Sequence, residues 1–328
     1  MINGIINVYK EQGFTSHDVV AKLRGILHQK KIGHTGTLDP EATGVLPVCL
    51  GNGTRLCDML TDTDKVYRAR MLLGMTTDTQ DTSGSILSEC PVDLSSDVVK
   101  AAVHSFIGAY DQVPPMYSAL KVGGKKLYEL AREGREVERK SRRVNISYIN
   151  IEEIEIIRDF ETLTDAPDVI RFKEHPADFP KMTVTITVGC SKGTYIRTLC
   201  HDIGQKLGVG GCMSALERIR VGIFEAEQAK TLDQIAGAVE DGSIMSWIVP
   251  VDAMFAHMPR ITVNDQGDRL LHNGNPLSRS CVILADSVQL GDGMHFRVYD
   301  KAGIFTGVYV YSRKSGQFKV VKMFLQER

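Results

Sequence analysis

The sequence lacks several features that would assign it to a specialised class of protein. Its formal net charge is only −1 over 328 residues, so any basic surface for a nucleic acid has to be local. No apolar run approaches the roughly 20 residues of a membrane-spanning helix. The first residues show no basic stretch followed by a long apolar region, which argues against a signal peptide. We therefore expect a cytoplasmic protein that does not associate with a membrane.

The cysteines argue against two further classes of protein. The chain has seven of them, and none forms a Cys-x-x-Cys pair of the kind found in zinc ribbons and thioredoxin-like motifs. An odd and scattered set fits a reducing compartment better than a disulfide framework. Internal repeats and low-complexity tracts are also lacking. We expect no disulfide scaffold and no bound metal.

What is present points to about two domains, at the usual size of roughly 100–200 residues each. The first 248 residues mix strand-like alternation with helical 3–4 spacing. From residue 249 to 328 the pattern changes to short apolar runs separated by Gly, Asn and Asp, which predicts a small all-β domain. The predicted strands span 5–8, 45–50, 65–73, 144–157 and 183–188, and the predicted helices span about 16–27, 98–107 and 194–207.

Helix caps and insertions complete this outline. Thr15 or Ser16, Thr194 and Thr231 are the expected helix N-caps, since hydroxyl side chains accept bonds from the first backbone amides. Residues 76–84 form a polar, acidic loop. Residues 158–181 are polar, contain three prolines and are expected to form a surface insertion.

Residues 121–143 differ in character from the rest of the chain. They contain nine Lys or Arg and four Glu, a local excess of five positive charges. Pro114-Pro115 and Gly123-Gly124 supply turn residues around the start of the stretch. This stretch is either a solvated charged surface or a contact for RNA phosphates, which need local rather than global positive charge.

The loop from Gly33 to Gly44 is the most informative segment. It holds three glycines, a histidine and an aspartate directly before a buried strand. Glycine lets the backbone approach a ligand closely. A phosphate-binding P-loop would end in Gly-Lys-Ser/Thr, and this loop does not. The residues alone leave open whether the segment is a functional site or a tight turn.

Five segments, in order, resemble motifs of the TruB family of tRNA pseudouridine synthases. The resemblance covers roughly residues 1–248 and is weaker beyond them. The loop with its flank, Gly33–Pro47, is similar almost letter for letter to the family's active-site motif. The other segments are Lys10–Ser16, Asp64–Tyr67, Gly193–Leu199 and Leu216–Phe224.

The resemblance implies isomerisation of the T-loop uridine at position 55 of tRNA to pseudouridine. This reaction breaks the N-glycosidic bond, turns the base and rejoins it through carbon. It needs no redox step and no group donor, so no cofactor is expected. An ionised carboxylate can serve as nucleophile towards the base or the ribose. The uridine lies within a folded loop, so the nucleotide must be flipped out.

The same resemblance assigns roles to individual residues. Asp39 is the expected nucleophile, although an Asp-Pro turn residue is the structural alternative. Arg197 is expected to pair with Asp39 and to favour its ionised form; otherwise it is a solvated helix arginine. Tyr67 is expected to stack on the target base and to accept its proton, although its strand face also suits a core tyrosine.

Further residues are expected to bind the substrate. Tyr195 and Leu216 would line the base pocket, with core packing as the alternative. His34 would help occupy the space that the flipped nucleotide vacates, and Lys10 would support the loop. The RNA-clamping insertion corresponds to about 111–143, with the following expected RNA contacts: Lys121, Lys125, Lys126, Arg139 and Arg142.

For the fold, the resemblance implies an α/β protein of the α+β type. A catalytic domain over 1–248, built on a mixed, mainly antiparallel sheet, would precede a PUA-like RNA-binding domain over 249–328 that includes Leu271–Leu277. The segment 158–181 is longer than the family pattern. We expect a monomer that binds the T-arm of tRNA.

Two other functions stay open. A non-enzymatic RNA-binding module or tRNA-folding chaperone could use the same scaffold, but Asp39, Tyr67 and Arg197 favour an enzyme. The guide-RNA-dependent branch of the superfamily usually has N-terminal extensions, whereas this chain starts almost at the first motif. We therefore expect no guide RNA.

Overall fold

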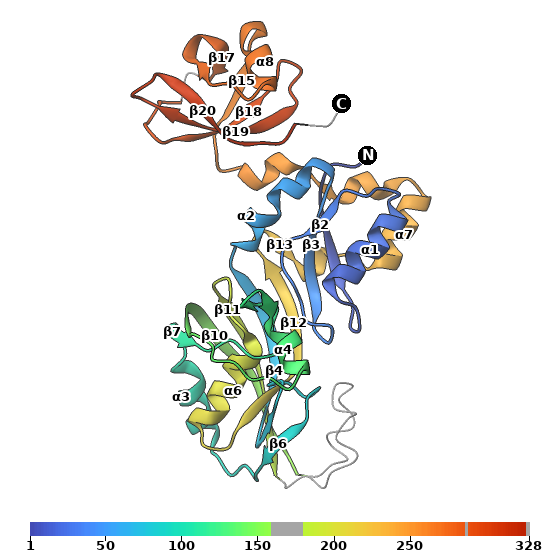
Figure 1. The fold of residues 1–328 in the computed structure, drawn as a ribbon, viewed down its shortest axis with the longest axis vertical. Helices are drawn as coiled ribbons and strands as arrows, with labels where there is room; N and C mark the ends of the chain where they lie inside the picture. The colour runs from blue at the N-terminus through green and yellow to red at the C-terminus, as the bar shows by residue number, and fades with distance from the viewer. Residues whose placement is uncertain (159–179, 286–287, 326–328) are drawn as a thin grey trace.

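A large sheet flanked by helices carries a smaller sheet at its C-terminal end (Figure 1). The computed structural model describes residues 1–158, 180–285 and 288–325. Among these, no helix is long and apolar enough to cross a membrane. Most of the polar segment expected at 158–181 lies outside the described residues.

The large sheet has ten strands in the order β14-β1-β3-β12-β4-β11-β10-β7, with β2 paired to β3 and β13 paired to β12. Every pairing is antiparallel except that of β12 with β3. The prediction of a mixed, mainly antiparallel sheet is confirmed. The strands are β1 (Gly4–Lys10), β2 (Ile32–His34), β3 (Thr43–Leu50), β4 (Lys65–Leu73), β7 (Gly108–Gln112), β10 (Arg142–Ile157), β11 (Lys181–Cys190), β12 (Gly211–Val221), β13 (Phe224–Glu225) and β14 (Ile248–Val249).

The helices cover the sheet in two groups. Helices α1 (Ser16–Ile26) and α7 (Leu232–Glu240) enclose one apolar cluster with β1 and β3. Helices α3 (Ser96–His104) and α6 (Ile196–Lys206) enclose another with β4, β10 and β11. Shorter helices are α2 (Cys57–Thr61) and α4 (Leu127–Arg132), and the 3₁₀ helices are η1 (Gly51–Leu56), η3 (Ala226–Gln228), η4 (Ser243–Trp247), η5 (Val251–Phe255) and η6 (Arg279–Cys281).

Two of the predicted caps are confirmed and one is wrong. Thr15 caps α1 and Thr231 caps α7, each in a capping box. Helix α6 begins one residue later than expected, with Tyr195 as its N-cap and no side-chain capping bond. The Thr194 hydroxyl instead donates to the carbonyl oxygen of Ser191 at 2.9 Å. Local turn bonding competes with capping for such side chains.

Strand β4 has the two faces that its alternation predicts. Tyr67, Ala69 and Met71 are buried in the cluster under α6. On the opposite face Arg68 and Arg70 bond to glutamates of β10. In the β10–β11 pairing the register shifts between Ile146 and Tyr148.

Smaller strands form two hairpins beside the sheet. Strand β5 (Met75–Thr77) pairs with β6 (Ile86–Glu89), so the acidic loop begins within a strand. Strands β8 (Lys121–Val122) and β9 (Lys125–Lys126) turn at Gly123-Gly124 inside the basic stretch. Helix α4 follows directly.

The C-terminal sheet has six strands in the order β16-β20-β19-β18-β15-β17. The domain is built of β-structure, as expected, together with one helix, α8 (Asp265–His272). Phe305 and Phe324 pack with Phe255 and with Ile5 of β1, so the two sheets share an apolar cluster. The strands are β15 (Arg260–Val263), β16 (Leu277–Ser278), β17 (Val282–Leu284), β18 (His295–Tyr299), β19 (Phe305–Ser312) and β20 (Gln317–Met323).

Candidate active site

Asp39 lies in the turn between β2 and β3, and both of its neighbours are anchored. The amide of Leu38 donates to the buried Ser16 hydroxyl at 2.9 Å. The carbonyl oxygen of Pro40 accepts from Lys10 Nζ at 3.0 Å and from the Gly13 amide at 2.9 Å. The carboxylate between them is therefore held on a fixed backbone.

Lys10 has no exposed surface. Burial lowers the pKa of its ammonium to about 8, against an ordinary value of 10.5. The amine is directed at backbone carbonyls of the loop and not at solvent. Its geometry fits the expected support of the loop.

Arg197, on α6, contacts the Asp39 carboxylate with two nitrogens. Nε lies 3.0 Å from Oδ2, and Nη2 lies 3.4 Å from Oδ1. The Arg197 side chain is 6% exposed, whereas that of Asp39 is 41% exposed. The cation is thus enclosed while the carboxylate keeps an open side for a substrate. The expected ion pair is present, and Arg197 is not a solvated helix arginine.

Arg197 is itself held by three further acceptors. Nη1 lies 3.3 Å from Asp81 Oδ2 and donates to the carbonyl oxygen of Thr79 at 3.1 Å. Nη2 donates to the carbonyl oxygen of Tyr117 at 2.8 Å. Sequence reasoning missed Asp81. The only signal was an acidic residue in the 76–84 loop, and nothing in the loop showed that it would meet α6.

The backbone at Gln80 explains how the residues before and after it, Thr79 and Asp81, both reach Nη1 of Arg197. Gln80 has φ of 63°, a left-handed conformation that non-glycine residues rarely adopt. Its side-chain oxygen accepts from the hydroxyl of Thr198 at 2.8 Å, which ties the loop to α6. This local strain places the Thr79 carbonyl and the Asp81 carboxylate on the same side of Arg197.

Burial raises the pKa of Asp39 above its ordinary value. The positive charge of Arg197 lowers this pKa, the negative charge of Asp81 raises it, and Lys10 lowers it. Arg197 therefore acts in the expected direction, but burial outweighs it. The site holds a carboxylate that is less solvated than an ordinary aspartate, which suits a nucleophile.

Tyr67 is 9% exposed and belongs to the apolar cluster under α6. Burial raises the pKa of its hydroxyl, and the positive charge of Arg218 opposes that shift. The ring therefore has the core packing that its strand face suggested. Tyr67 pairs in register with Arg218 of β12, whose guanidinium bonds to backbone oxygens on both sides of Asp39.

Tyr195 and Leu216 approach the site from different elements. The amide of Tyr195 donates to Gln112 Oε1 at 2.8 Å, and Gln112 Nε2 donates back to the Tyr195 carbonyl at 3.0 Å. This reciprocal pair, which sequence reasoning missed, fixes the start of α6 two residues before Arg197. Leu216 lines a pocket of about 240 Å³ between β3 and β12, together with Glu41, two residues after Asp39.

His34 ends β2 at the start of the loop and is half-buried. Its Nδ1 lies 3.2 Å from the Gly36 carbonyl oxygen, so it stabilises the turn. Its ring meets that of His17 edge-on, with centroids 5.1 Å apart. Burial lowers the pKa of His34, and His17 adds to this. Sequence reasoning missed His17, which lies at the start of α1.

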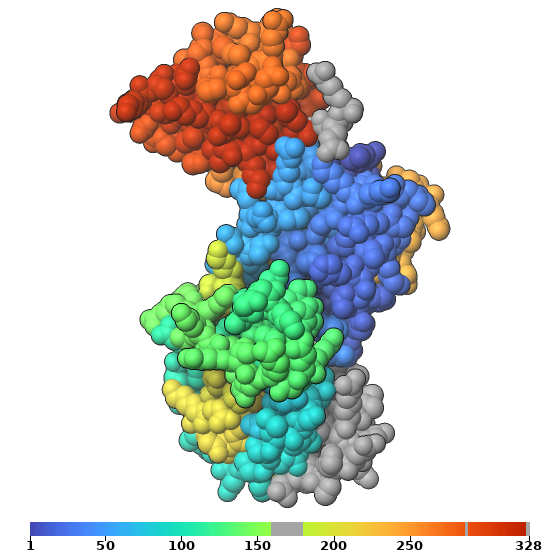
Figure 2. Space-filling model, viewed as in Figure 1, coloured from blue at the N-terminus to red at the C-terminus, as the bar shows by residue number. Residues whose placement is uncertain are grey.

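The basic insertion stands out from the viewed face, in green beside the blue N-terminal part (Figure 2). Lys121 and Arg142 are exposed. Lys125 pairs with Glu133 at 3.0 Å, and Lys126 lies 3.2 Å from the hydroxyl of Tyr128. Arg139 is 21% exposed and pairs with a glutamate at 3.2 Å, and it is one of two partly buried residues, with Lys126, among the five predicted RNA contacts.

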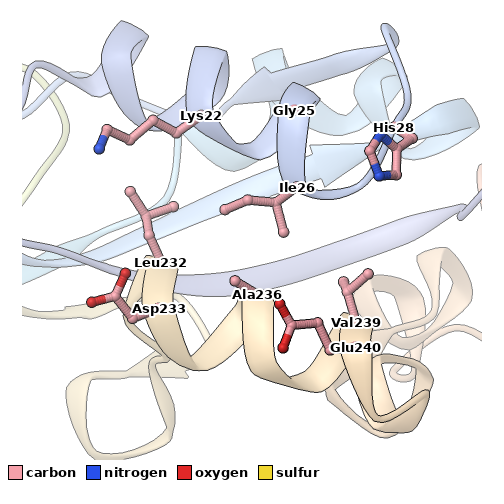
Figure 3. Close-up of a pocket in the computed structure, with 9 residues that line it drawn as sticks. All are labelled: Lys22, Gly25, Ile26, His28, Leu232, Asp233, Ala236, Val239 and Glu240. Carbon is pink, nitrogen blue, oxygen red and sulfur yellow. The ribbon is translucent and has the colours of Figure 1, made fainter.

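A pocket of about 560 Å³ lies elsewhere, between α1 and α7 (Figure 3). Ile26, Leu232 and Ala236 line it, with Lys22 and Asp233 among the charged residues at its edge. None of the predicted site residues lines it. We therefore place the candidate site at Asp39, where the charged groups converge, and not at this larger hollow.

Metal-ligating side chains also come together away from Asp39. Asp268, His272 and Asp300 offer donor atoms that lie within 4.8 Å of one another. Both aspartates already accept backbone N–H bonds through Oδ1. Such bonds explain the arrangement as turn capping, and the absence of a metal stays a prediction.

Two family models match the chain. The TruB family pseudouridylate synthase (N terminal domain) model matches residues 24–196, and the tRNA pseudouridylate synthase B C-terminal domain model matches residues 197–256. A "tRNA pseudouridine synthase B" of Lachnoclostridium phytofermentans is 47% identical over 99% of this chain and 100% of its own. One from Bacillus pumilus is 43% identical over 84% of this chain and 83% of its own.

Solved structures agree with this assignment. The protein in "Crystal Structure of a Cbf5-Nop10-Gar1 Complex" is 26% identical, with a TM-score of 0.66, and covers 98% of this chain and 85% of that chain. The fold, the paired aspartate and arginine, and these relatives together define a pseudouridine synthase, an enzyme that isomerises uridine in RNA. Within that class, the chain belongs to the TruB family.

Proposed function

We propose that the protein isomerises the T-loop uridine at position 55 of tRNA to pseudouridine, with Asp39 as nucleophile. The observation that carries the proposal is the half-open Asp39 carboxylate, bound through two nitrogens by the buried Arg197. Arg197 keeps the carboxylate oriented, and the exposed side of Asp39 is where a reacting atom can approach. The relatives named tRNA pseudouridine synthase B support tRNA as the substrate.

The reaction divides between a few groups. Asp39 bonds either to C6 of uracil or to C1′ of the ribose, and the glycosidic bond between C1′ and N1 breaks. The freed base turns, its C5 bonds to C1′, and the bond to Asp39 breaks, which returns the carboxylate. C5 then loses a proton and N1 gains one, and the Tyr67 hydroxyl is the proposed relay, which takes up the C5 proton as it passes on its own. No group is added or removed, so the sequence of steps requires no cofactor.

The target nucleotide must leave the T-loop stack to reach Asp39. The cost of unstacking is a few kcal/mol and has to be offset by contacts in the site. We assign the base pocket to Tyr195 and Leu216, which approach from α6 and β12. His34 is proposed to occupy the vacated space. Its half-buried ring at the mouth of the loop supports this role.

Contacts to the rest of the T-arm are assigned to the basic insertion and to the C-terminal domain. The insertion reaches the site through the Tyr117 carbonyl, which accepts from Arg197. RNA binding by Lys121, Lys125, Lys126 and Arg142 would therefore be transmitted to the group that holds Asp39. The PUA-like domain would contact more distant parts of the tRNA.

The test is an unmodified tRNA transcript incubated with the purified protein and no guide RNA, followed by mapping of pseudouridine. Asp39→Asn keeps the size of the side chain but removes its charge, so it should form no product and still bind tRNA. Glu41→Gln is the matched control, because this carboxylate lies two residues away and hydrogen-bonds only to Gln12 among the described residues.

The outcomes separate the remaining alternatives. Product at position 55 with wild type and Glu41→Gln, but not with Asp39→Asn, supports the proposal. Binding without product from the wild type would favour an RNA-binding module or chaperone. Product only after a guide RNA is added would favour the guide-RNA-dependent branch of the superfamily.

A further inference from the structure

Arg218 is the largest side chain among the fully buried ones, with 2% exposure. It lies on β12, opposite Tyr67 of β4 in the antiparallel register and opposite Gly44 of β3 in the parallel register. Strand β12 is flanked by both β3 and β4 at Glu217 and Arg218, and Arg218 is the one of the two that lies opposite Tyr67.

The guanidinium bonds to both sides of the Asp39 loop. Nε donates to the carbonyl oxygen of Val45 at 2.7 Å, and Nη1 lies 3.5 Å from the carbonyl oxygen of Thr37. One acceptor precedes Asp39 by two residues and the other follows it by six. A single rigid group thus spans the base of the catalytic turn.

Glycines make this approach possible. At Gly44, with φ of 103°, an added Cβ would lie 2.3 Å from the Arg218 carbonyl oxygen. At Gly36, with φ of 146°, an added Cβ would lie 3.7 Å from Arg218 Nη1, which is an ordinary contact. Gly44 therefore allows β3 to close onto the backbone of Arg218, whereas Gly36 serves the conformation of the turn.

The same residue lies directly opposite Tyr67 in the β12–β4 register, and its positive charge lowers the pKa of the Tyr67 hydroxyl against the effect of burial. Within the described part of the chain, Arg218 forms no ion pair with a carboxylate, and its buried Nη2 has no hydrogen-bond partner. A buried cation without a carboxylate is costly unless polar groups satisfy it. This unfavourable burial of Arg218 is found where the strand that carries Tyr67 and the Asp39 loop come together.

We propose that Arg218 is a positioning residue for the isomerisation, which fixes the Asp39 loop and the Tyr67 hydroxyl relative to each other. The inference rests on the proposed function of Asp39 and Tyr67. Arg218 is too deeply buried to bind an RNA phosphate. It is also distinct from Arg197, which contacts the Asp39 carboxylate itself, because Arg218 acts through backbone oxygens and a phenol.

The test compares Arg218→Met and Arg218→Lys with the wild type under single-turnover conditions, with tRNA affinity measured separately. Arg220→Met is the matched control, because Arg220 is exposed on the same strand. Misplacing reactive groups by about 1 Å can lower a rate on the order of 10²-fold. We expect a loss of that size for Arg218→Met, with tRNA affinity retained within about threefold.

Arg218→Lys should recover part of the rate. Lysine keeps the positive charge, but its single ammonium group cannot reach Val45, Thr37 and Tyr67 together, as the planar guanidinium of arginine can. A residue that only stabilises the fold would lower melting temperature and active fraction, without slowing the single-turnover rate of the folded protein. If Arg218→Met does not fold, Arg218→Lys alone decides the point, through a slowed rate at retained affinity.

Three results would overturn the inference. They are a wild-type rate in either folded variant, a parallel loss of rate and affinity, and an equal loss in Arg220→Met. Failure of the wild type to form pseudouridine would instead refute the proposed function, so the two failures can be told apart.

Discussion

Replacing Arg197 with methionine should slow the reaction and move its acid limb to higher pH. The change removes the cation that contacts both oxygens of Asp39, and it leaves Asp39 and Asp81 near each other without their shared partner. Methionine fills a similar volume within the cluster under α6, so loss of packing is limited.

The size of the rate loss follows from the contacts. Hydrogen bonds to charged groups are worth about 1.5–3 kcal/mol each. Asp39 is 41% exposed, so its two contacts, at 3.0 and 3.4 Å, belong at the lower end of that range. Together they amount to about 3 kcal/mol, which corresponds to about a hundredfold slower chemistry. Affinity for tRNA should change much less, because Arg197 is 6% exposed.

The direction of the pH effect follows from the charges around Asp39. The reaction needs the ionised carboxylate, so the rate falls as the pH drops through the pKa of Asp39. Arg197 lowers this pKa and Asp81 raises it. The acid limb of kcat/KM should therefore move to higher pH in Arg197→Met and to lower pH in Asp81→Asn.

The assay is pseudouridine formation on an unmodified transcript between about pH 5 and 8, with kcat/KM reporting on the free enzyme. Asp81→Asn is the informative comparison, because it retains a side-chain oxygen to accept from Arg197. Shifts of the same sign in the two variants, or no shift in either, would refute the assignment of Asp39 as the titrating nucleophile. A collapse of tRNA affinity in Arg197→Met would reassign that residue to RNA contact.

Three further predictions follow from the same structure. Changing Lys121, Lys125, Lys126 and Arg142 to glutamine should weaken tRNA binding and reduce the log–log salt slope by about 0.7–0.9 for each lost phosphate contact; an unchanged slope in salt titrations would identify a solvated face. Deleting residues 259–328, which retains β14 and η5, should raise KM for full-length tRNA more than kcat falls, provided that circular dichroism shows a folded protein. Activity on a T-arm stem-loop should be affected much less. Equal losses on both RNAs would show that this domain does not contact tRNA beyond the T-arm. Lys10→Met should abolish a rise in stability between about pH 8 and 10.5, because the folded pKa of Lys10 lies below its ordinary 10.5 and the unfolded chain binds more protons in that window. An unchanged pH dependence in thermal melts would show that the Lys10 amine does not titrate in this window.

Local patterns in the sequence were sufficient to predict most of the secondary structure. The limits of β4, predicted from its alternation, match the observed strand at both ends. The caps at Thr15 and Thr231 follow from side chains that bond within their own turn. The predicted cap at Thr194 is wrong because the Thr194 hydroxyl donates to the carbonyl oxygen of Ser191, three residues earlier. The sequence alone does not show which of two local hydrogen bonds of similar strength will form.

For the candidate site, too, the sequence identified some residues and missed others. The motif around Asp39 and the segment around Arg197 could be recognised as strings of residues, and both lie where a carboxylate and a cation meet. Asp81 and Gln112 carried no such signal, and Arg218 lies in the recognisable Leu216–Phe224 segment but had no role that the sequence could show, because the importance of all three depends on which distant atoms they reach.

The sequence by itself therefore singled out Asp39 as the candidate carboxylate, most of the helices and strands that carry the site, and the local excess of positive charge. Only the tertiary structure decided that Arg197 is shared between two carboxylates and that Arg218, opposite Tyr67, bonds to both sides of the Asp39 loop. The physical reason is the separation along the chain over which each interaction acts. Alternation, capping and turn formation act over a few residues, whereas Asp39 and Arg197 are separated by 158 positions. Their contact exists only because β12 and β4 close the sheet between them.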